Sequence, residues 1–127
     1  MKSDNFLLIC RNLYFREVHP FDFDKAETEL YQNITDFGKE YIKEYGLKAF
    51  LGFLMEGQYR VNFWAALIAL EYGDPRTDEK SGTSYAETVI DQCIDTVERH
   101  VGFHTTDKQQ RNGENWIKKI KTRYNKV

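Results

Sequence analysis

A chain of 127 residues with 41 % hydrophobic and 15 % aromatic side chains is long enough to bury one core, which predicts a single domain over residues 1–127 and excludes a disordered chain. The formal net charge is −2, but residues 1–106 hold 11 Lys and Arg against 18 Asp and Glu, whereas residues 107–127 hold 7 against 2. Because nucleic-acid-binding domains are usually basic as a whole, nucleic acid is not the partner that this composition favours.

The apolar runs and the cysteines bear on the compartment. No run approaches the ~20 apolar residues needed to cross a bilayer. The run at residues 6–10 is shorter than the apolar region of a signal peptide, and polar residues follow it. Cys10 and Cys93 lie among apolar residues at helical spacing, as buried free thiols do. We therefore expect a cytoplasmic protein with no membrane partner.

The first helix is predicted over about residues 3–17. Phe6, Cys10 and Leu13 recur at three- and four-residue spacing and form its inner face. The helix should end at His19-Pro20, because the residue before a proline is disfavoured in the helical conformation.

The second helix is predicted over about residues 25–45. Asp24 is placed to cap it, with Glu27 at the spacing of a capping box. Gly38 within this helix costs about 1 kcal/mol relative to Ala, which close approach of another helix would explain.

Residues 59–75 form the most apolar stretch and are expected to be the centre of the fold. Trp64, Leu67 and Ile68 recur at helical spacing, and the intervening alanines widen the apolar face until it covers most of the helix. Pro75 prevents further extension. A short helix over residues 47–57 precedes this one, so the two should form a helical hairpin.

Two amphipathic helices are predicted after a loop over residues 73–83. One covers residues 84–101 and the other residues 107–124, with Asp107 placed to cap the second. The expected structural core contains Trp64, Leu67, Ile68, Ile90 and Trp116. The sequence thus predicts an all-α domain of five to six helices in antiparallel hairpins, either a HEAT-like short solenoid or an irregular helical bundle.

No metal, cofactor or catalytic site is expected. His100 and His104 have the spacing of two metal ligands on a helix, but Gly102 separates them and no third ligand is near in sequence. Asp22, Asp24 and Glu27 lack the glycine and terminal glutamate of a calcium loop. The chain contains neither a Gly-x-Ser-x-Gly motif nor a glycine-rich phosphate loop.

The surface charges favour a binding protein. Residues of the first linker, the second helix and the loop give the first two-thirds of the chain a negative field, which favours rapid capture of a basic partner. The candidate partner-binding residues are Asp22, Glu27, Glu29, Asp74, Arg76, Asp78 and Glu79.

The string VNFWAALIALEYGDP at residues 61–75 resembles the second helix of a HEAT-type repeat. It is similar to a pattern in small bacterial HEAT-like proteins, in which a Val-x-x-Trp-Ala-Ala helix ends in an acidic or proline-containing turn. An amphipathic helix and a Trp-bearing helix then follow, and residues 84–101 and 116–119 match that order, so the resemblance covers residues 59–120. Several such proteins are regarded as immunity proteins of bacterial toxin systems. The resemblance implies a protein that neutralises a cognate toxin, for example a basic nuclease, by occlusion.

Two other functions stay open. The first is a nucleic-acid-associated regulator that uses the basic last helix, whose candidate contacts are Lys118, Lys119, Lys121, Arg123 and Lys126. The second is an enzyme with a site that no motif reveals.

Overall fold

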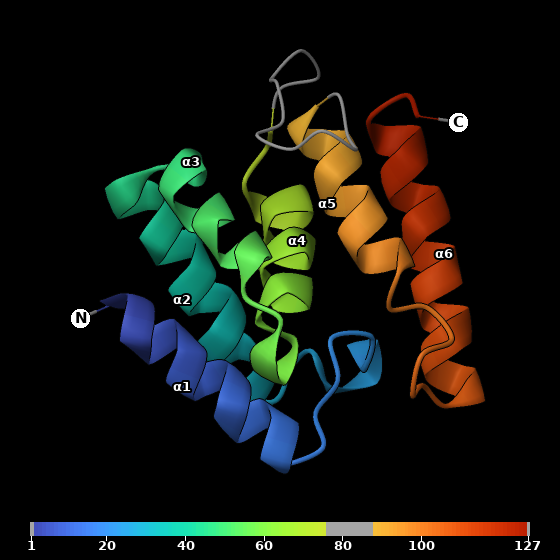
Figure 1. The fold of residues 1–127 in the computed structure, drawn as a ribbon. Helices are drawn as coiled ribbons and strands as arrows, with labels where there is room; N and C mark the ends of the chain where they lie inside the picture. Colours follow the sequence, from blue (N-terminus) through green and yellow to red (C-terminus); the bar gives the residue numbers. More distant parts are fainter. Residues whose placement is uncertain (1, 76–87, 127) are drawn as a thin grey trace.

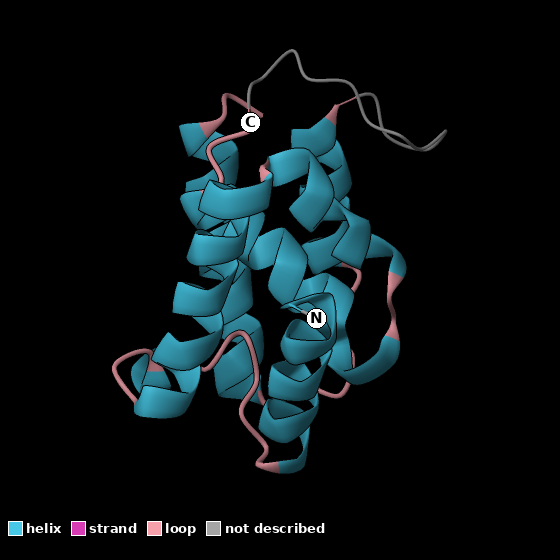
Figure 2. Ribbon diagram, turned by 90° about the vertical axis from the view of Figure 1, so that its left-hand side faces the viewer, coloured by secondary structure: helices cyan, strands magenta, loops and turns pink. Residues whose placement is uncertain are grey.

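The computed structural model describes residues 2–75 and 88–126. These ranges contain six α-helices (Figure 1): α1 (Lys2–Phe15), α2 (Glu29–Tyr45), α3 (Leu47–Phe50), α4 (Val61–Tyr72), α5 (Val89–Glu98) and α6 (Asp107–Arg123). Three short 3-10 helices cover Phe23–Lys25, Leu51–Met55 and Gln58–Arg60. Every regular element in the described ranges is helical (Figure 2), which confirms the all-α prediction.

Helix α4 lies at the centre of the bundle. It contacts α1, α2 and α3 on one side and α5 on the other (Figure 1). The side chain of Trp64 is 1 % exposed, and Leu67 and Ile68 are equally enclosed. A helix that is apolar around most of its circumference needs neighbours on several sides, and α4 has them. The buried residues form one hydrophobic cluster that also includes Ile90 and Trp116, as expected.

The arrangement is an irregular helical bundle, and a regular HEAT-like repeat is not confirmed. Close packing of α2 on α4 does follow the prediction made for Gly38. A Cβ atom on Gly38 would lie 2.7 Å from Cγ2 of Ile68, so only a glycine lets the two helices approach this closely.

The starts of α2 and α6 differ from the predicted ones. Helix α2 begins at Glu29, and its cap is Thr28, whose Oγ1 accepts a hydrogen bond from the Tyr31 amide. The predicted cap by Asp24 is wrong, because a separate 3-10 helix occupies residues 23–25. Helix α6 is capped by Thr106, one residue before the predicted Asp107.

The segment between α1 and α2 is bound to the start of α6, far away in sequence. Phe21 packs against Gly113, and the side-chain amide of Asn112 donates a 2.9 Å hydrogen bond to the Phe21 carbonyl. The side-chain amide of Gln109 donates a 2.9 Å hydrogen bond to Asp22 Oδ1. Asp22 Oδ2 accepts a 2.8 Å hydrogen bond from the backbone amide of His19. The bonds from Asn112 and Gln109 hold the α1–α2 segment against the start of α6, in the lower part of the view (Figure 1).

The predicted loop over residues 73–83 lies outside the described residues from residue 76 onward. The helix predicted from residue 84 begins only at Val89, because Thr88 is extended and caps α5 by accepting a hydrogen bond from the Asp91 amide. Among the described helices, none combines the length and the apolar character that crossing a membrane requires.

Candidate functional site

Two adjoining pockets open at the N-terminal end of α4. Both are lined by Tyr14, Arg60 and His104, and their volumes are about 370 and 470 Å³. We call them together the Arg60 cleft. The remaining lining residues are Glu17, His19, Gly57, Gln58, Tyr59, His100, Phe103, Thr106 and Gln109.

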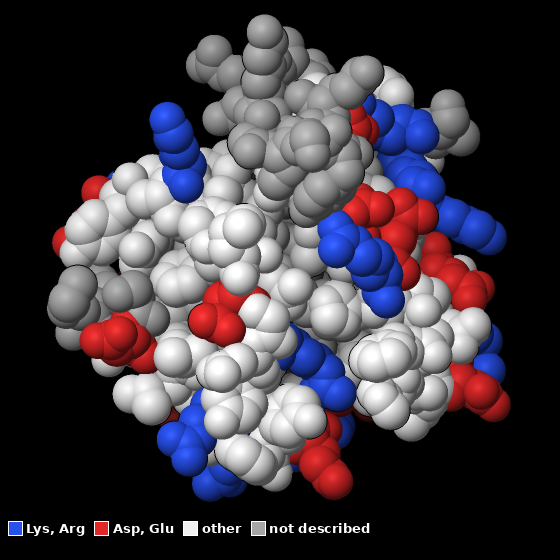
Figure 3. Space-filling model, viewed as in Figure 1, with Lys and Arg blue, Asp and Glu red and all other residues white. Residues whose placement is uncertain are grey.

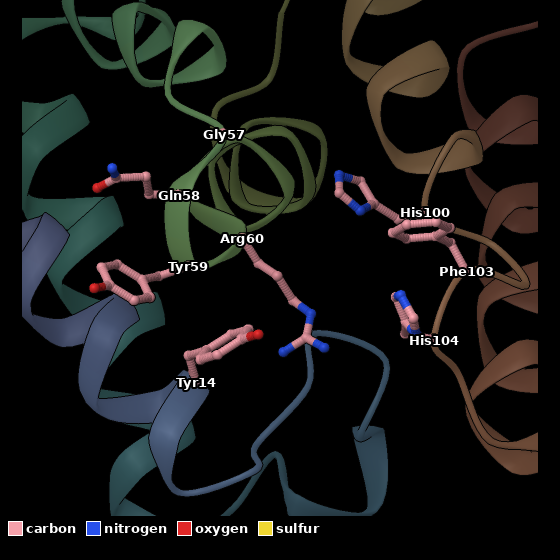
Figure 4. Close-up of a pocket in the computed structure, with 8 residues that line it drawn as sticks. All are labelled: Tyr14, Gly57, Gln58, Tyr59, Arg60, His100, Phe103 and His104. Carbon is pink, nitrogen blue, oxygen red and sulfur yellow. The ribbon is translucent and has the colours of Figure 1, made fainter.

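Three distant segments build this cleft (Figure 4). Tyr14 comes from the last turn of α1, and Tyr59 and Arg60 come from the turn before α4. His100 and His104 come from the segment between α5 and α6. The Arg60 side chain extends into the space between the Tyr14 and His104 rings. The fold therefore brings a cation, phenol rings and imidazoles to one place.

Left-handed backbone conformations gather at the Arg60 cleft. Six described residues other than glycine have a positive φ, and four of them line the cleft: Glu17 (58°), Tyr59 (52°), Arg60 (59°) and His104 (53°). This conformation costs an ordinary side chain roughly 1–2 kcal/mol. Residues held in this way concentrate at functional sites, where the surrounding structure retains them.

Hydrogen bonds across the turn hold Tyr59 and Arg60 in place. The Asn62 amide donates a 2.9 Å hydrogen bond back to the Glu56 carbonyl. The Gln58 amide donates to Glu56 Oε1 at 3.0 Å. Arg60 occupies the N-cap position of α4, where its side chain makes no capping bond. The guanidinium is consequently free to point into the cleft.

The Arg60 guanidinium has no hydrogen-bond acceptor and no carboxylate partner among the described residues. The guanidinium makes a cation–π contact with the Tyr14 ring, whose centroid lies 4.9 Å from Arg60 Cζ. Burial lowers the pKa of Arg60, and the proximity of Tyr14 and Asp22 offsets this only in part. A partly buried cation therefore lacks a compensating anion.

All three histidines of the chain line the Arg60 cleft. Burial lowers the pKa of His19 to about 4, with a further contribution from the charge of Arg60. The pKa of His100 is also lowered to about 4, mainly by burial and then by the charge of Arg60. The His19 Nδ1 accepts a 3.0 Å hydrogen bond from the Phe21 amide. Both imidazoles are neutral at pH 7, and such low pKa values make them weak general bases there.

Aromatic side chains surround the cleft, and all of them except the half-buried Tyr59 are exposed. We call Tyr14, Phe15, Tyr59 and Phe103 the aromatic rim. Phe15 is 64 % and Phe103 65 % exposed. The rings of Tyr14, Phe15 and Tyr59 lie within 5.6–5.8 Å of one another, centroid to centroid. Solvent exposure of several large rings around one cleft is typical of an interaction surface.

The described residues include no group of three or more His, Cys, Asp or Glu side chains placed to hold a metal ion. What the Arg60 cleft offers chemically is one cation, neutral imidazoles and phenol hydroxyls. These groups suit the recognition of an anionic group by hydrogen bonding.

Among the described residues, the acidic side chains predicted to bind a partner do not form one surface. Asp22 is 7 % exposed and binds inward, so its predicted place on the surface is wrong. Glu27 and Glu29 are exposed and, with Asp36, line a pocket of about 670 Å³ at the start of α2. Asp74 is exposed after the far end of α4 (Figure 1). The three other candidates, Arg76, Asp78 and Glu79, lie outside the described residues.

Much of the basic charge of the last helix is paired within the protein. Lys121, Arg123 and Lys126 form ion pairs of 3.1–3.4 Å with Glu98, Glu71 and Asp91, respectively. Basic and acidic side chains consequently lie side by side over α5 and α6 (Figure 3). Lys118 and Lys119 are exposed. This pairing reduces the charge that the helix could offer to phosphates.

Sequence reasoning missed the Arg60 cleft because its residues come from three segments that carry no shared motif. His100 and His104 are the only signal in the sequence, and their spacing suggests metal ligands and not proximity to Arg60. Comparison with family models, curated proteins and solved structures finds no match to this chain.

Proposed function

We propose that this protein is a protein-binding domain that inhibits its partner by covering part of the partner's surface, and that the Arg60 cleft with its aromatic rim makes the contact. The observation that carries this proposal is a guanidinium with no ion-pair partner among the described residues, in a cleft bordered by aromatic rings of which Tyr14, Phe15 and Phe103 are exposed. Arginine, tyrosine and tryptophan dominate the energetics of protein interfaces, and aromatic residues in general are enriched there. A surface of this composition supports protein binding better than nucleic-acid binding or catalysis.

The specific form of the proposal is an immunity protein that neutralises a cognate bacterial toxin in the cytoplasm. The resemblance of residues 59–120 to HEAT-like immunity proteins supports it. The acidic balance of residues 1–106 supports a basic toxin such as a nuclease, because opposite charge accelerates association. Glu27 and Glu29, which lie outside the cleft, would contribute to that steering. The free, buried thiols of Cys10 and Cys93 suit a reducing compartment.

The test is co-expression with the toxin encoded by a neighbouring gene, with cell growth as the measurement. We expect the wild-type protein to restore growth. Replacing both Phe15 and Phe103 by Ala should remove protection without unfolding the protein, because both rings are exposed. Lys119→Ala, an exposed change on α6, is the matched control and should protect fully. No protection by the wild-type protein would overturn the function, and full protection by the double variant would exclude this face.

A further inference from the structure

Arg60 differs from Arg123, an exposed arginine that is paired within the bundle. Arg123 is 37 % exposed in its side chain, and its guanidinium donates to both the Glu71 carboxylate and the Leu70 carbonyl. Arg60 is the only Lys or Arg among the described residues that line the cleft, and it donates to no acceptor in the described ranges. Since guanidinium groups removed from water are normally paired, the N–H groups of the partly buried Arg60 are available to bind a ligand.

Other donors lie around the end of this side chain. Figure 4 shows the Tyr14 hydroxyl directed towards the Arg60 guanidinium, with the His104 ring on the opposite side. The N-terminal end of α4 adds a partial positive charge at the same place. Its first amides already bond within the turn, so side chains would make the contacts to a ligand. A group that sits between Tyr14, Arg60 and His104 would touch both pockets of the cleft.

The charge of the cleft limits the ligand. Arg60 supplies one positive charge, and the neighbouring His19 and His100 imidazoles are neutral at pH 7. Glu17 is exposed at the edge of the cleft and would repel a second negative charge. A monoanion matches this environment better than a phosphate, which carries close to two negative charges at pH 7. The planar guanidinium also fits a carboxylate through two parallel hydrogen bonds.

The geometry points to a binding site for a single carboxylate group, held by the Arg60 guanidinium between the Tyr14 and His104 side chains. This inference rests on the proposed function in that an acidic side chain or the C-terminal carboxylate of the partner protein would enter the cleft. The aromatic rim would then pack against the apolar surface around that carboxylate. Arg60 and His104 both have left-handed backbone conformations at this site.

The test is a titration of the isolated protein with acetate, followed by NMR, at constant ionic strength. Acetamide, which has the same shape without the charge, is the control ligand, and inorganic phosphate is the competing anion. We expect half-saturation on the order of 10 mM, the weak binding typical of a single charge-assisted contact. Chemical shifts should change at the Arg60 side chain and at His104, and the bound anion should raise the pKa of His19 and His100 by offsetting the charge of Arg60.

Variants separate the contact from general charge effects. Arg60→Gln should abolish acetate binding, and Arg60→Lys should weaken it several-fold because the planar fork is lost. Lys119→Gln removes one exposed charge elsewhere and should bind acetate normally. If Arg60→Gln does not fold, the map of shifted residues in the wild-type protein decides the question.

Each outcome bears on the site. Acetate shifts that are confined to the cleft and absent with acetamide support it. Tighter binding of phosphate than of acetate would overturn the carboxylate assignment, and no binding of either anion would overturn the site itself. Failure of the growth test with acetate binding intact would overturn the proposed function alone, so the two failures are distinguishable.

Discussion

Gly113 in α6 lies so close to Phe21 that a Cβ atom added to the glycine would come within 2.3 Å of Cε2 of the ring. From helix propensity alone, a glycine at this position would only weaken α6. In the structure it makes room for the aromatic side chain that joins the α1–α2 segment to α6. We predict that Gly113→Ala destabilises the protein by about 1–3 kcal/mol, because overpacking outweighs the gain of about 1 kcal/mol in helix propensity. Urea unfolding monitored by circular dichroism measures the change.

Gly52 provides the control for Gly113. It also lies in a helical segment, but nothing comes within 4 Å of a Cβ atom added there. Gly52→Ala should leave stability unchanged or raise it slightly. Equal effects of the two substitutions would show that helix propensity, and not the contact with Phe21, decides the result at Gly113.

Trp64 is the second position where packing leads to a quantitative prediction. Its indole is 1 % exposed and meets the Tyr31 ring edge to face, with centroids 5.1 Å apart. Tyr31 in turn donates a 2.6 Å hydrogen bond to the Pro20 carbonyl. Trp64→Ala should lower the free energy of unfolding by about 3–5 kcal/mol, because it leaves a large cavity in the core. Trp64→Phe should cost less, and an unchanged thermal midpoint for the alanine variant would contradict the core role.

The fold was predictable where the signal was periodic. The central helix, the core residues of α5 and α6 and the close approach at Gly38 all follow from residue spacing and size. The starts of α2 and α6 did not, because several adjacent side chains can cap a helix and only the three-dimensional turn selects Thr28 or Thr106.

The candidate site was much less predictable than the fold. Charge counts suggested a surface containing Asp22, but a count does not tell that its carboxylate bonds to the His19 amide and the Gln109 side chain. Nor does the sequence reveal that Arg60 adopts a left-handed conformation and has no partner among the described residues. The Asp22–Gln109 bond joins residues 87 positions apart, and the Arg60 cleft joins three separate segments, which local patterns do not report.

The start of α6 supplies a prediction about capping. Thr106 Oγ1 accepts a 3.1 Å hydrogen bond from the Gln109 amide, and Gln109 Oε1 accepts one of 3.0 Å from the Thr106 amide. Thr106→Ala should cost about 1 kcal/mol, because it leaves a helix amide without its acceptor. Asp107→Asn should cost less, since Asp107 contributes only through the helix dipole. Chemical denaturation of both variants distinguishes the observed cap from the one expected from sequence.

Acidification should destabilise the protein at a pH above that of ordinary carboxylate titration. The pKa of His19 and of His100 is lowered from 6.5 to about 4, so the unfolded chain binds more protons than the folded one between these values. Stability is therefore present above pH 6.5 and falls as the pH drops towards 4. Because each pKa unit corresponds to 1.36 kcal/mol, we expect a loss of about 3–4 kcal/mol between pH 7 and pH 5 for the two histidines together. Urea unfolding across this range measures it.

The pH range and one variant identify the histidines as the cause. The bond to Lys108 is the main cause that lowers the pKa of Asp24. The stability that this carboxylate contributes is lost only as the pH falls below about 4. Arg60→Gln removes a positive charge that disfavours protonation of both imidazoles, so it should raise their pKa values and flatten the loss between pH 7 and pH 5. Burial still opposes protonation in that variant, so both pKa values should stay below 6.5. Stability that is constant from pH 7 to pH 5 in the wild-type protein would mean that the two rings are not held neutral by the fold.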